Sequence, residues 1–391
     1  MMLRSWCGLS NGRSTRTRCN VQPMTGPAQT PPLLVPSSIR QTPELPLRPR
    51  AIVGIGAGAI VREAHAPAYR MSGFSLCSVY DLERERAEQL ASEFGIPRVC
   101  SSLAEAIASA PEGAVFDLAL PAAAVAEVLA QLPDGAPVLI QKPMGENLEE
   151  ARQLLAICER KQLLAAVNFQ LRFAPCLMAA RDLLERGQLG ELHDVEVRVT
   201  CDMPWQLWTF LFGIPRMEIV YHSIHYVDLV RSFFGEPEGV YAKTVKHPGQ
   251  MQLASTRTAI AFDYGNVKRA NVTSNHGHAF GLEHQESYVK LEGTHGAIVA
   301  RLGVNLDYPR GLPDKLEYCL LRDGAPPTWQ ELPLVGNWFP HAFVGTMASL
   351  MRYANRETEE LPTSVSDAFK TMAVVEACYQ SSDRGSTPIP R

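Results

Sequence analysis

Two histidines lie in a segment whose residue spacing fits a helix, residues 221–228. Tyr221 and His225 are four residues apart and His225 and Asp228 are three apart, so these three side chains share a helix face. A histidine held by a carboxylate accepts protons well near neutral pH, which makes His225 a candidate catalytic residue, aided by Tyr221 or His222. Two alternatives stay open: a histidine packed in the core, and a His222/His225 metal site that lacks a clear third ligand.

A lysine follows the apolar run 138–140 and precedes a proline. Lys142 would then project from the end of a buried strand. Partial burial disfavours the charged ammonium and lowers the pKa of the amine toward neutrality. Such an amine can bind a substrate hydroxyl or transfer a proton. The alternative is a solvated lysine in a loop.

Glycines at alternate positions end an apolar run near the start of the first strand–helix unit. Two frames of the nucleotide-binding pattern fit: Gly54, Gly56 and Ala59, or Gly56 and Gly58 with the bulky Val61 in third place. Glycine permits a tight turn and leaves room for a pyrophosphate, whose charge the first N–H groups of the next helix would bind. A simple tight turn would also explain the pattern.

An acidic residue ends the next apolar run, about 25 residues after the glycines. Asp81 could accept hydrogen bonds from the ribose hydroxyls of a dinucleotide. Its alternative role is to cap the helix that begins near residue 82, and the two roles are compatible. A carboxylate here repels a 2′-phosphate, so NAD is favoured, although Arg84 leaves NADP possible.

Strand and helix patterns alternate through the first half of the chain. After the glycine turn, we expect apolar strands over 76–80, 115–120, 138–140 and 164–169, separated by helices. This alternation predicts a doubly wound parallel sheet, a Rossmann domain spanning 48–171. Ligands bind beyond the carboxyl ends of such strands, and four candidate residues stand there: Gly56, Asp81, Pro121 and Lys142.

The second half changes to alternating strand patterns. We expect hairpins that pair 258–262 with 268–273, 288–291 with 297–302, and 317–321 with 328–332. Together with helices these predict an α+β substrate domain over 172–391 with a mostly antiparallel open sheet. His276 and His278 fall in a predicted loop and are interpreted as incidental. The aromatic residues around Trp205 and Trp208 are expected to form a lid, a core or a subunit contact.

Composition limits the classes of partner. The 391-residue chain has a net charge of −4 and a pI near 6.2, which gives no signature of nucleic-acid binding. No apolar run reaches the roughly 20 residues of a membrane span. The nine cysteines include no C-x-x-C pair, so we expect a reducing compartment and a cytoplasmic location. Residues 1–47, with no acidic residue before Glu44, are expected to be a disordered leader.

As an ordered set, these motifs resemble one known family. The set runs from the glycine turn 56–60 through His65-x-Pro67 and 141–143 to 171–173 and His225-x-x-Asp228. It is similar to the glucose–fructose oxidoreductase / inositol dehydrogenase / MocA family over about residues 50 to 385. The resemblance implies NAD(P)-dependent hydride transfer on a sugar, cyclitol or related polyhydroxylated substrate, and a homo-oligomer.

The resemblance also implies roles for particular residues. It identifies Lys142 as a substrate contact and His225 as the catalytic histidine, and it places further residues at the cofactor: Gly56, Gly58, Ala59, Ile60, Asp81, Pro121, Gln141 and Arg172. No metal is expected.

Two departures from the family pattern stand out. Gln141 replaces the family's glutamate, and Tyr221 stands where an aspartate is frequent. The leading hypothesis is therefore a dehydrogenase with an altered proton relay. The alternative is a non-catalytic protein that senses nucleotide on the same fold.

Overall fold

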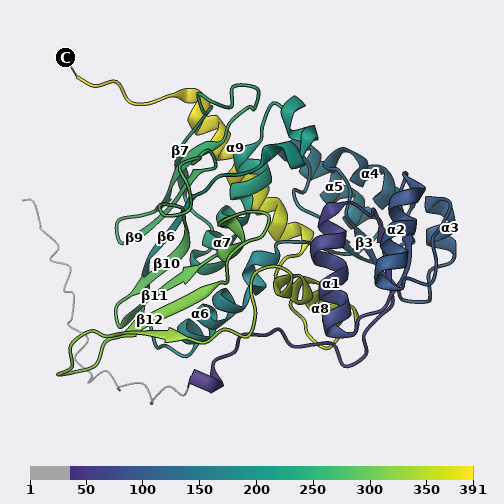
Figure 1. Cartoon of the computed structure of the whole chain (residues 1–391), viewed down its shortest axis with the longest axis horizontal. Helices are drawn as coiled ribbons and strands as arrows, with labels where there is room; N and C mark the ends of the chain where they lie inside the picture. The colour runs from purple at the N-terminus through teal and green to yellow at the C-terminus, as the bar shows by residue number, and fades with distance from the viewer. Residues whose placement is uncertain (1–35, 391) are drawn as a thin grey trace, which may run out of the picture. The chain divides into compact units, whose positions relative to one another are not determined.

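A parallel sheet forms the core of the first half. The computed structural model describes residues 36–390 (Figure 1). The strands of this sheet are β1 (Ile52–Ile55), β2 (Leu76–Tyr80), β3 (Val115–Leu118), β4 (Pro137–Ile140) and β5 (Leu164–Val167). Their order is β2-β1-β3-β4-β5, and all neighbouring pairs are parallel. The predicted doubly wound sheet is confirmed, and the strand order reverses between β1 and β3.

Helices connect these strands, as the alternation predicts. They are α1 (Ala66–Ser72), α2 (Arg84–Phe94), α3 (Leu103–Ala108), α4 (Ala122–Gln131) and α5 (Leu148–Arg160). Asn147 caps α5, because its side-chain oxygen accepts a hydrogen bond from the Glu150 N–H at 3.0 Å. Short α3 was not expected from the sequence.

An eight-stranded sheet dominates the second half (Figure 1). Its strands are β6 (Leu192–Thr200), β7 (Gly239–Val245), β8 (Arg257–Tyr264), β9 (Lys268–Asn275), β10 (Glu286–Gly293), β11 (Gly296–Arg301), β12 (Lys315–Leu320) and β13 (Trp329–Leu332). All neighbouring pairs are antiparallel except β6 and β9. The three predicted hairpins are present. Edge strand β7 escaped prediction because its inward side chains are only half-buried.

The remaining helices pack against both sheets. They are α6 (Pro175–Glu185), α7 (Ile224–Phe234), α8 (His341–Ala354) and α9 (Val365–Arg384). Helix α8 returns to the parallel sheet, where Phe343 and Met347 share a buried cluster with Ile52, Val115 and Leu139. Helix α8, from the C-terminal part of the chain, therefore covers one face of the parallel sheet and completes the hydrophobic core on that face.

Part of the predicted leader lies within the described residues. Ile39 and Gln41 are buried, and the Gln41 side chain bonds the Pro333 carbonyl and the Val335 N–H, each at 3.0 Å. Residues 36–47 therefore pack against the folded chain. The rest of the predicted leader, 1–35, lies outside the described residues. Within 36–390, no helix has both the length and the apolarity needed to cross a bilayer.

Candidate active site

The glycine turn fits the second of the two possible frames. Gly54 lies inside β1, whereas Gly56 begins the turn with φ +103°, a left-handed value that favours glycine. A Cβ on Gly56 would lie 2.4 Å from the Ala119 carbonyl oxygen, but one on Gly58 would meet nothing within 4 Å. Gly56 therefore makes the tight turn, and the open space over Gly58 is the kind that a pyrophosphate needs.

The third position of the motif is occupied by a bulky residue. Val61 is buried, and it begins a π-helical turn, η2 (Val61–His65), in the helix after the glycines. A third glycine would allow close helix–strand packing. Here the helix is widened at the valine. The first N–H groups of a helix have no intrahelical partner, and Ala59 and Ile60 stand at the start of this one.

Asp81 lies against the glycine turn. Its Oδ2 accepts a 2.7 Å hydrogen bond from the Ala57 N–H, and its Oδ1 accepts one from the Glu83 N–H at 2.8 Å. The predicted cap is wrong, because α2 begins at Arg84 and its N-cap residue is Glu83. Asp81 instead orders the two residues before that cap and stands beside the glycine turn. A carboxylate has further lone pairs that ribose hydroxyls can use. These features fit a dinucleotide held at this edge of the sheet.

Lys142 stands at the end of β4, as predicted. Its Nζ donates a 2.7 Å hydrogen bond to the backbone carbonyl of Tyr221, and burial lowers the pKa of the amine to about 8. Gln141 precedes it, buried, and its Oε1 accepts the Lys142 backbone N–H at 2.9 Å. The amine is thus positioned between the two halves of the chain, with its proton more easily released than that of an exposed lysine.

His225 lies on α7 in an apolar setting. Its side chain is buried, with its ring edge-on to Phe169 (6.3 Å between centroids) and to Trp338 (5.7 Å). Burial, and then the charge of Lys142, hold the pKa of His225 well below its ordinary value. The imidazole is therefore neutral near pH 7, and its Nδ1 has no hydrogen-bond partner within 36–390. A neutral, unpaired imidazole can accept a substrate proton.

The predicted pairing of His225 with Asp228 is wrong. Asp228 is buried, and its carboxylate accepts bonds from Arg172 at 2.5 and 2.6 Å and from the Thr371 hydroxyl at 3.0 Å. Arg172 also bonds Asp367 and the Pro362 carbonyl, so four of its five N–H groups are used. This geometry favours a structural role for Arg172 over the expected cofactor contact.

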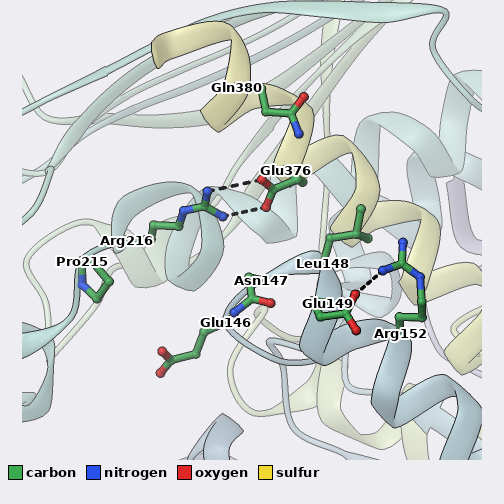
Figure 2. A pocket seen from close by; sticks show the side chains of 9 residues that line it. All are labelled: Glu146, Asn147, Leu148, Glu149, Arg152, Pro215, Arg216, Glu376 and Gln380. Carbon is green, nitrogen blue, oxygen red and sulfur yellow. Dashed lines mark hydrogen bonds and ion pairs between the residues drawn. The ribbon is translucent and has the colours of Figure 1, made fainter. Parts of the chain in front are cut away.

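Tyr221 lies in a second π-helical turn. The turn η6 (Glu218–Ser223) precedes α7, and the hydroxyl of Tyr221 donates to Glu146 at 2.8 Å. The tyrosine hydroxyl thus points to the loop after β4. A cavity of about 490 Å³ lies beside this loop, lined by Glu146 but not by Lys142 (Figure 2). Across it, Arg216 pairs with Glu376.

His276 and Glu218 form a buried ion pair beside His222. The interpretation of this histidine as incidental is wrong. His276 is fully buried, with Nε2 3.2 Å from Glu218 Oε1 and its ring 4.9 Å from that of His222. Burial opposes the charge of His276, but contacts with Cys201 and Glu218 outweigh it and raise its pKa to about 10. Burial, and then the charge of His276, hold the pKa of His222 well below its usual range.

One signal in the sequence would have placed His276 in the core. Along β9, the buried positions are Ala270, Val272 and Ser274, and the alternation of the strand continues to His276. The predicted loop is confirmed, since β9 ends at Asn275, but interpreting His276 as incidental was wrong because its side chain is buried. Among residues 36–390, no group of three or more His, Cys, Asp or Glu side chains is arranged to hold a metal ion.

The aromatic segments approach the two histidines. Trp205 is buried and lies 5.0 Å from the ring of His222, and Trp338 lies against His225. Pro121 precedes α4 at the carboxyl end of β3, as predicted. The structure therefore brings together Lys142, His222 and His225 between the strand ends and the larger sheet. It also places Trp205 there.

Comparisons with known proteins agree with this arrangement. A model of an oxidoreductase family with an NAD-binding Rossmann fold matches residues 50–169, and the model of that family's C-terminal alpha/beta domain matches 181–390. The chain is 24% identical over 360 residues to D-apiose dehydrogenase of Rhizobium rhizogenes, covering 86% of this chain and 96% of that protein.

Solved structures show the same fold. An oxidoreductase of Agrobacterium radiobacter in complex with NAD+, L-tartaric acid and magnesium is 22% identical, with a TM-score of 0.69 over 87% of this chain and 98% of that one. Levoglucosan dehydrogenase, in complex with NADH and levoglucosan, is 17% identical, with a TM-score of 0.68 over 86% and 98%. The chain thus belongs to the glucose–fructose oxidoreductase / inositol dehydrogenase / MocA family of oxidoreductases, with an NAD-binding Rossmann fold and a C-terminal alpha/beta domain.

Proposed function

We propose that this protein transfers a hydride between NAD(H) and a sugar, cyclitol or related polyhydroxylated substrate. The observation that supports this most is the placing of Lys142 and His225 between the carboxyl ends of the parallel strands and the larger sheet. Family membership and the sugar dehydrogenases among its relatives support the same class of reaction. The bound nicotinamide supplies the hydride chemistry.

The chain's own residues then handle the proton and the substrate oxygen. Neutral His225 accepts the proton of the substrate hydroxyl on its imidazole ring, or returns it in the reverse direction. Lys142 donates a hydrogen bond to the same oxygen and polarises it. His222, kept neutral by burial and by the adjacent charge of His276, is placed to bind a neighbouring hydroxyl or to assist the transfer.

The proposal extends to the cofactor that the protein prefers, its oligomeric state and its location in the cell. Gly56, Gly58, Ala59, Ile60, Pro121 and Gln141 border the space for the cofactor. Asp81 beside the glycine turn favours NAD, with NADP as the less favoured cofactor. We infer a Rossmann domain over 48–171, a substrate domain over 172–391, a homo-oligomer and a cytoplasmic location.

The test combines binding with turnover. Isothermal titration of NAD, NADH and NADP into the purified protein measures cofactor affinity, and a panel of polyols and aldoses then measures NADH formation. We expect binding of NAD and turnover that is lost in Lys142→Ala and His225→Ala. If no nicotinamide cofactor binds, the proposal is wrong.

One observation favours a second candidate function. Tyr221 occupies the position where the family frequently has an aspartate, and its hydroxyl bonds Glu146 rather than a group of the site. A protein that senses nucleotide without catalysis would bind NAD and would turn over no polyol. Its function would not change in Lys142→Ala. The same experiment therefore separates the two functions.

A further inference from the structure

A buried chain of hydrogen bonds links the helix after the glycine turn to Lys142. His65 is fully buried, and its Nδ1 lies 2.8 Å from Oδ2 of Asp117 on β3. The other ring nitrogen, Nε2, lies 3.3 Å from the side-chain nitrogen of Gln141. The side-chain oxygen of Gln141 in turn accepts the backbone N–H of Lys142 at 2.9 Å. The series therefore runs from Asp117 through two side chains to the backbone of the candidate lysine.

The backbone N–H of Lys142, at one end of this series, determines the direction of every hydrogen bond in it. The backbone N–H of Lys142 can only donate, so the oxygen of Gln141 must face it and the NH₂ group must face His65. The Nε2 of His65 is then the acceptor and carries no proton. The single proton of the imidazole lies on Nδ1, from which it is donated to Asp117.

A second amide reaches the same acceptor. The side-chain nitrogen of Asn168 lies 3.2 Å from His65 Nε2. The Asn168 oxygen accepts the Thr346 hydroxyl at 2.8 Å, which turns the NH₂ group of Asn168 toward the ring as well. Two donors thus face one unprotonated nitrogen, and a proton on Nε2 would point at both of them.

We propose that His65, in its neutral Nδ1-protonated form, is a positioning residue that sets the place of Lys142 through Gln141. This inference rests on the proposed function, because the importance of Lys142 is part of it. It also gives a physical reason for Gln141 in place of the family's glutamate. A carboxylate would present a second acceptor to Nε2, and His65 would have to take another proton to keep the contact.

The first test observes the ring directly and needs no turnover. Nitrogen NMR of the full chain labelled at histidine, with His65→Leu used to assign the signal, reports which ring nitrogen carries the proton. We expect a protonated Nδ1 and an unprotonated Nε2 in the wild type at neutral pH, and two protonated nitrogens in Gln141→Glu. A proton on Nε2 in the wild type, or an unchanged ring in Gln141→Glu, would overturn the proposal.

The second test asks whether the network positions the lysine. The pH dependence of chemical modification of the Lys142 amine is measured in wild type, His65→Leu and Tyr69→Phe. Tyr69 is the matched control, because its hydroxyl donates to Asp117 at 2.8 Å and lies 3.4 Å from His65 Nδ1. Tyr69→Phe therefore alters the Asp117 end of the network while leaving the contact between His65 Nε2 and Gln141 in place. We expect the titration midpoint of the amine to rise in His65→Leu, as the lysine gains access to water, and to stay unchanged in Tyr69→Phe.

Turnover then adds a readout that depends on the proposed function. We expect kcat in His65→Leu to fall by about 10²-fold, the cost of a displaced catalytic group, with the dissociation constant of NAD unchanged and with little change in Tyr69→Phe. If the wild type turns over no substrate, the NMR and modification experiments still decide the positioning role. Equal effects of His65→Leu and Tyr69→Phe on the titration of the Lys142 amine would contradict the positioning role of His65. If His65→Leu does not fold, the NMR result for Gln141→Glu tests that role instead.

Discussion

The amino group of Lys142 donates a 2.7 Å hydrogen bond to the backbone carbonyl oxygen of Tyr221. The contact joins the carboxyl end of β4 to η6, the turn directly before the helix that carries His225. An ammonium group has three donors, so a substrate oxygen can join this contact without displacing it. A substrate held by Lys142 would therefore lie between the parallel strands and the helix of His225.

Replacing Lys142 by methionine should stabilise the protein at neutral pH while removing activity. Burial lowers the pKa of the amine from 10.5 to about 8, so between these values the unfolded chain binds more protons than the folded one. Stability of the wild type therefore rises with pH in this window, and below it the buried charge costs at most about 3 kcal/mol. Denaturant titrations of both proteins at pH 7 and pH 10 measure the difference, which should be larger at pH 7.

Substitution of Asp228 should mainly lower stability, whereas substitution of His225 should mainly lower turnover. Asp228→Asn weakens the buried pair with Arg172 and should cost about 3 kcal/mol of unfolding free energy, yet leave the pH dependence of turnover unchanged. His225→Asn should reduce kcat by about 10²- to 10⁴-fold with little effect on stability. Urea denaturation and pH–rate profiles of the two variants check this. A shifted pH profile in Asp228→Asn would restore the pairing predicted from the sequence.

The sequence identified the elements of the site better than their contacts. Glycines, Asp81 and Lys142 could be placed because the carboxyl ends of parallel strands meet at one edge. The partner of His225 could not, since helical spacing brings Asp228 near it equally well whether or not Arg172 competes for the carboxylate. Arg172 lies 56 residues away from Asp228 in the chain.

Other differences arise from backbone irregularity. The π-helical turn at 218–223 contains Tyr221, whose hydroxyl bonds Glu146, and regular helical spacing cannot reveal such a turn. His276 was missed for a different reason: it lies in a loop one residue beyond the end of β9, yet it is buried. The ion pair with Glu218 then holds a charged side chain inside, where polar residues are usually excluded.

A pair of glycine variants should separate folding from cofactor binding. Gly56→Ala places a methyl group 2.4 Å from the Ala119 carbonyl oxygen at a left-handed φ, so it should lower both stability and NAD affinity. Gly58→Ala meets nothing within 4 Å, so its stability should stay within about 0.5 kcal/mol of the wild type. Thermal melts and NAD titrations measure the two effects. Unchanged NAD affinity in Gly58→Ala would argue against a pyrophosphate over this residue.

Asp81 should control the choice between NAD and NADP. Asp81→Ser removes the charge that repels a 2′-phosphate, so the affinity for NADP should rise relative to that for NAD. Asp81→Asn is the control, because it removes the charge but keeps an oxygen for the Ala57 N–H. Dissociation constants of both cofactors are measured for all three proteins. If the ratio of the two affinities is unchanged in both variants, this carboxylate does not set cofactor preference.

The most direct test of the central claim follows the hydride itself. The protein is incubated with NADH carrying deuterium at the reactive carbon and with a panel of keto sugars and oxidised cyclitols. Mass spectrometry then measures the deuterium content of each product. The proposed function predicts one deuterium in the reduced product with the wild type, and none with Lys142→Ala or His225→Ala. Transfer that persists in both variants would contradict the roles of these residues. Bound NADH with no transfer to any substrate would contradict the dehydrogenase and favour a protein that only senses the nucleotide.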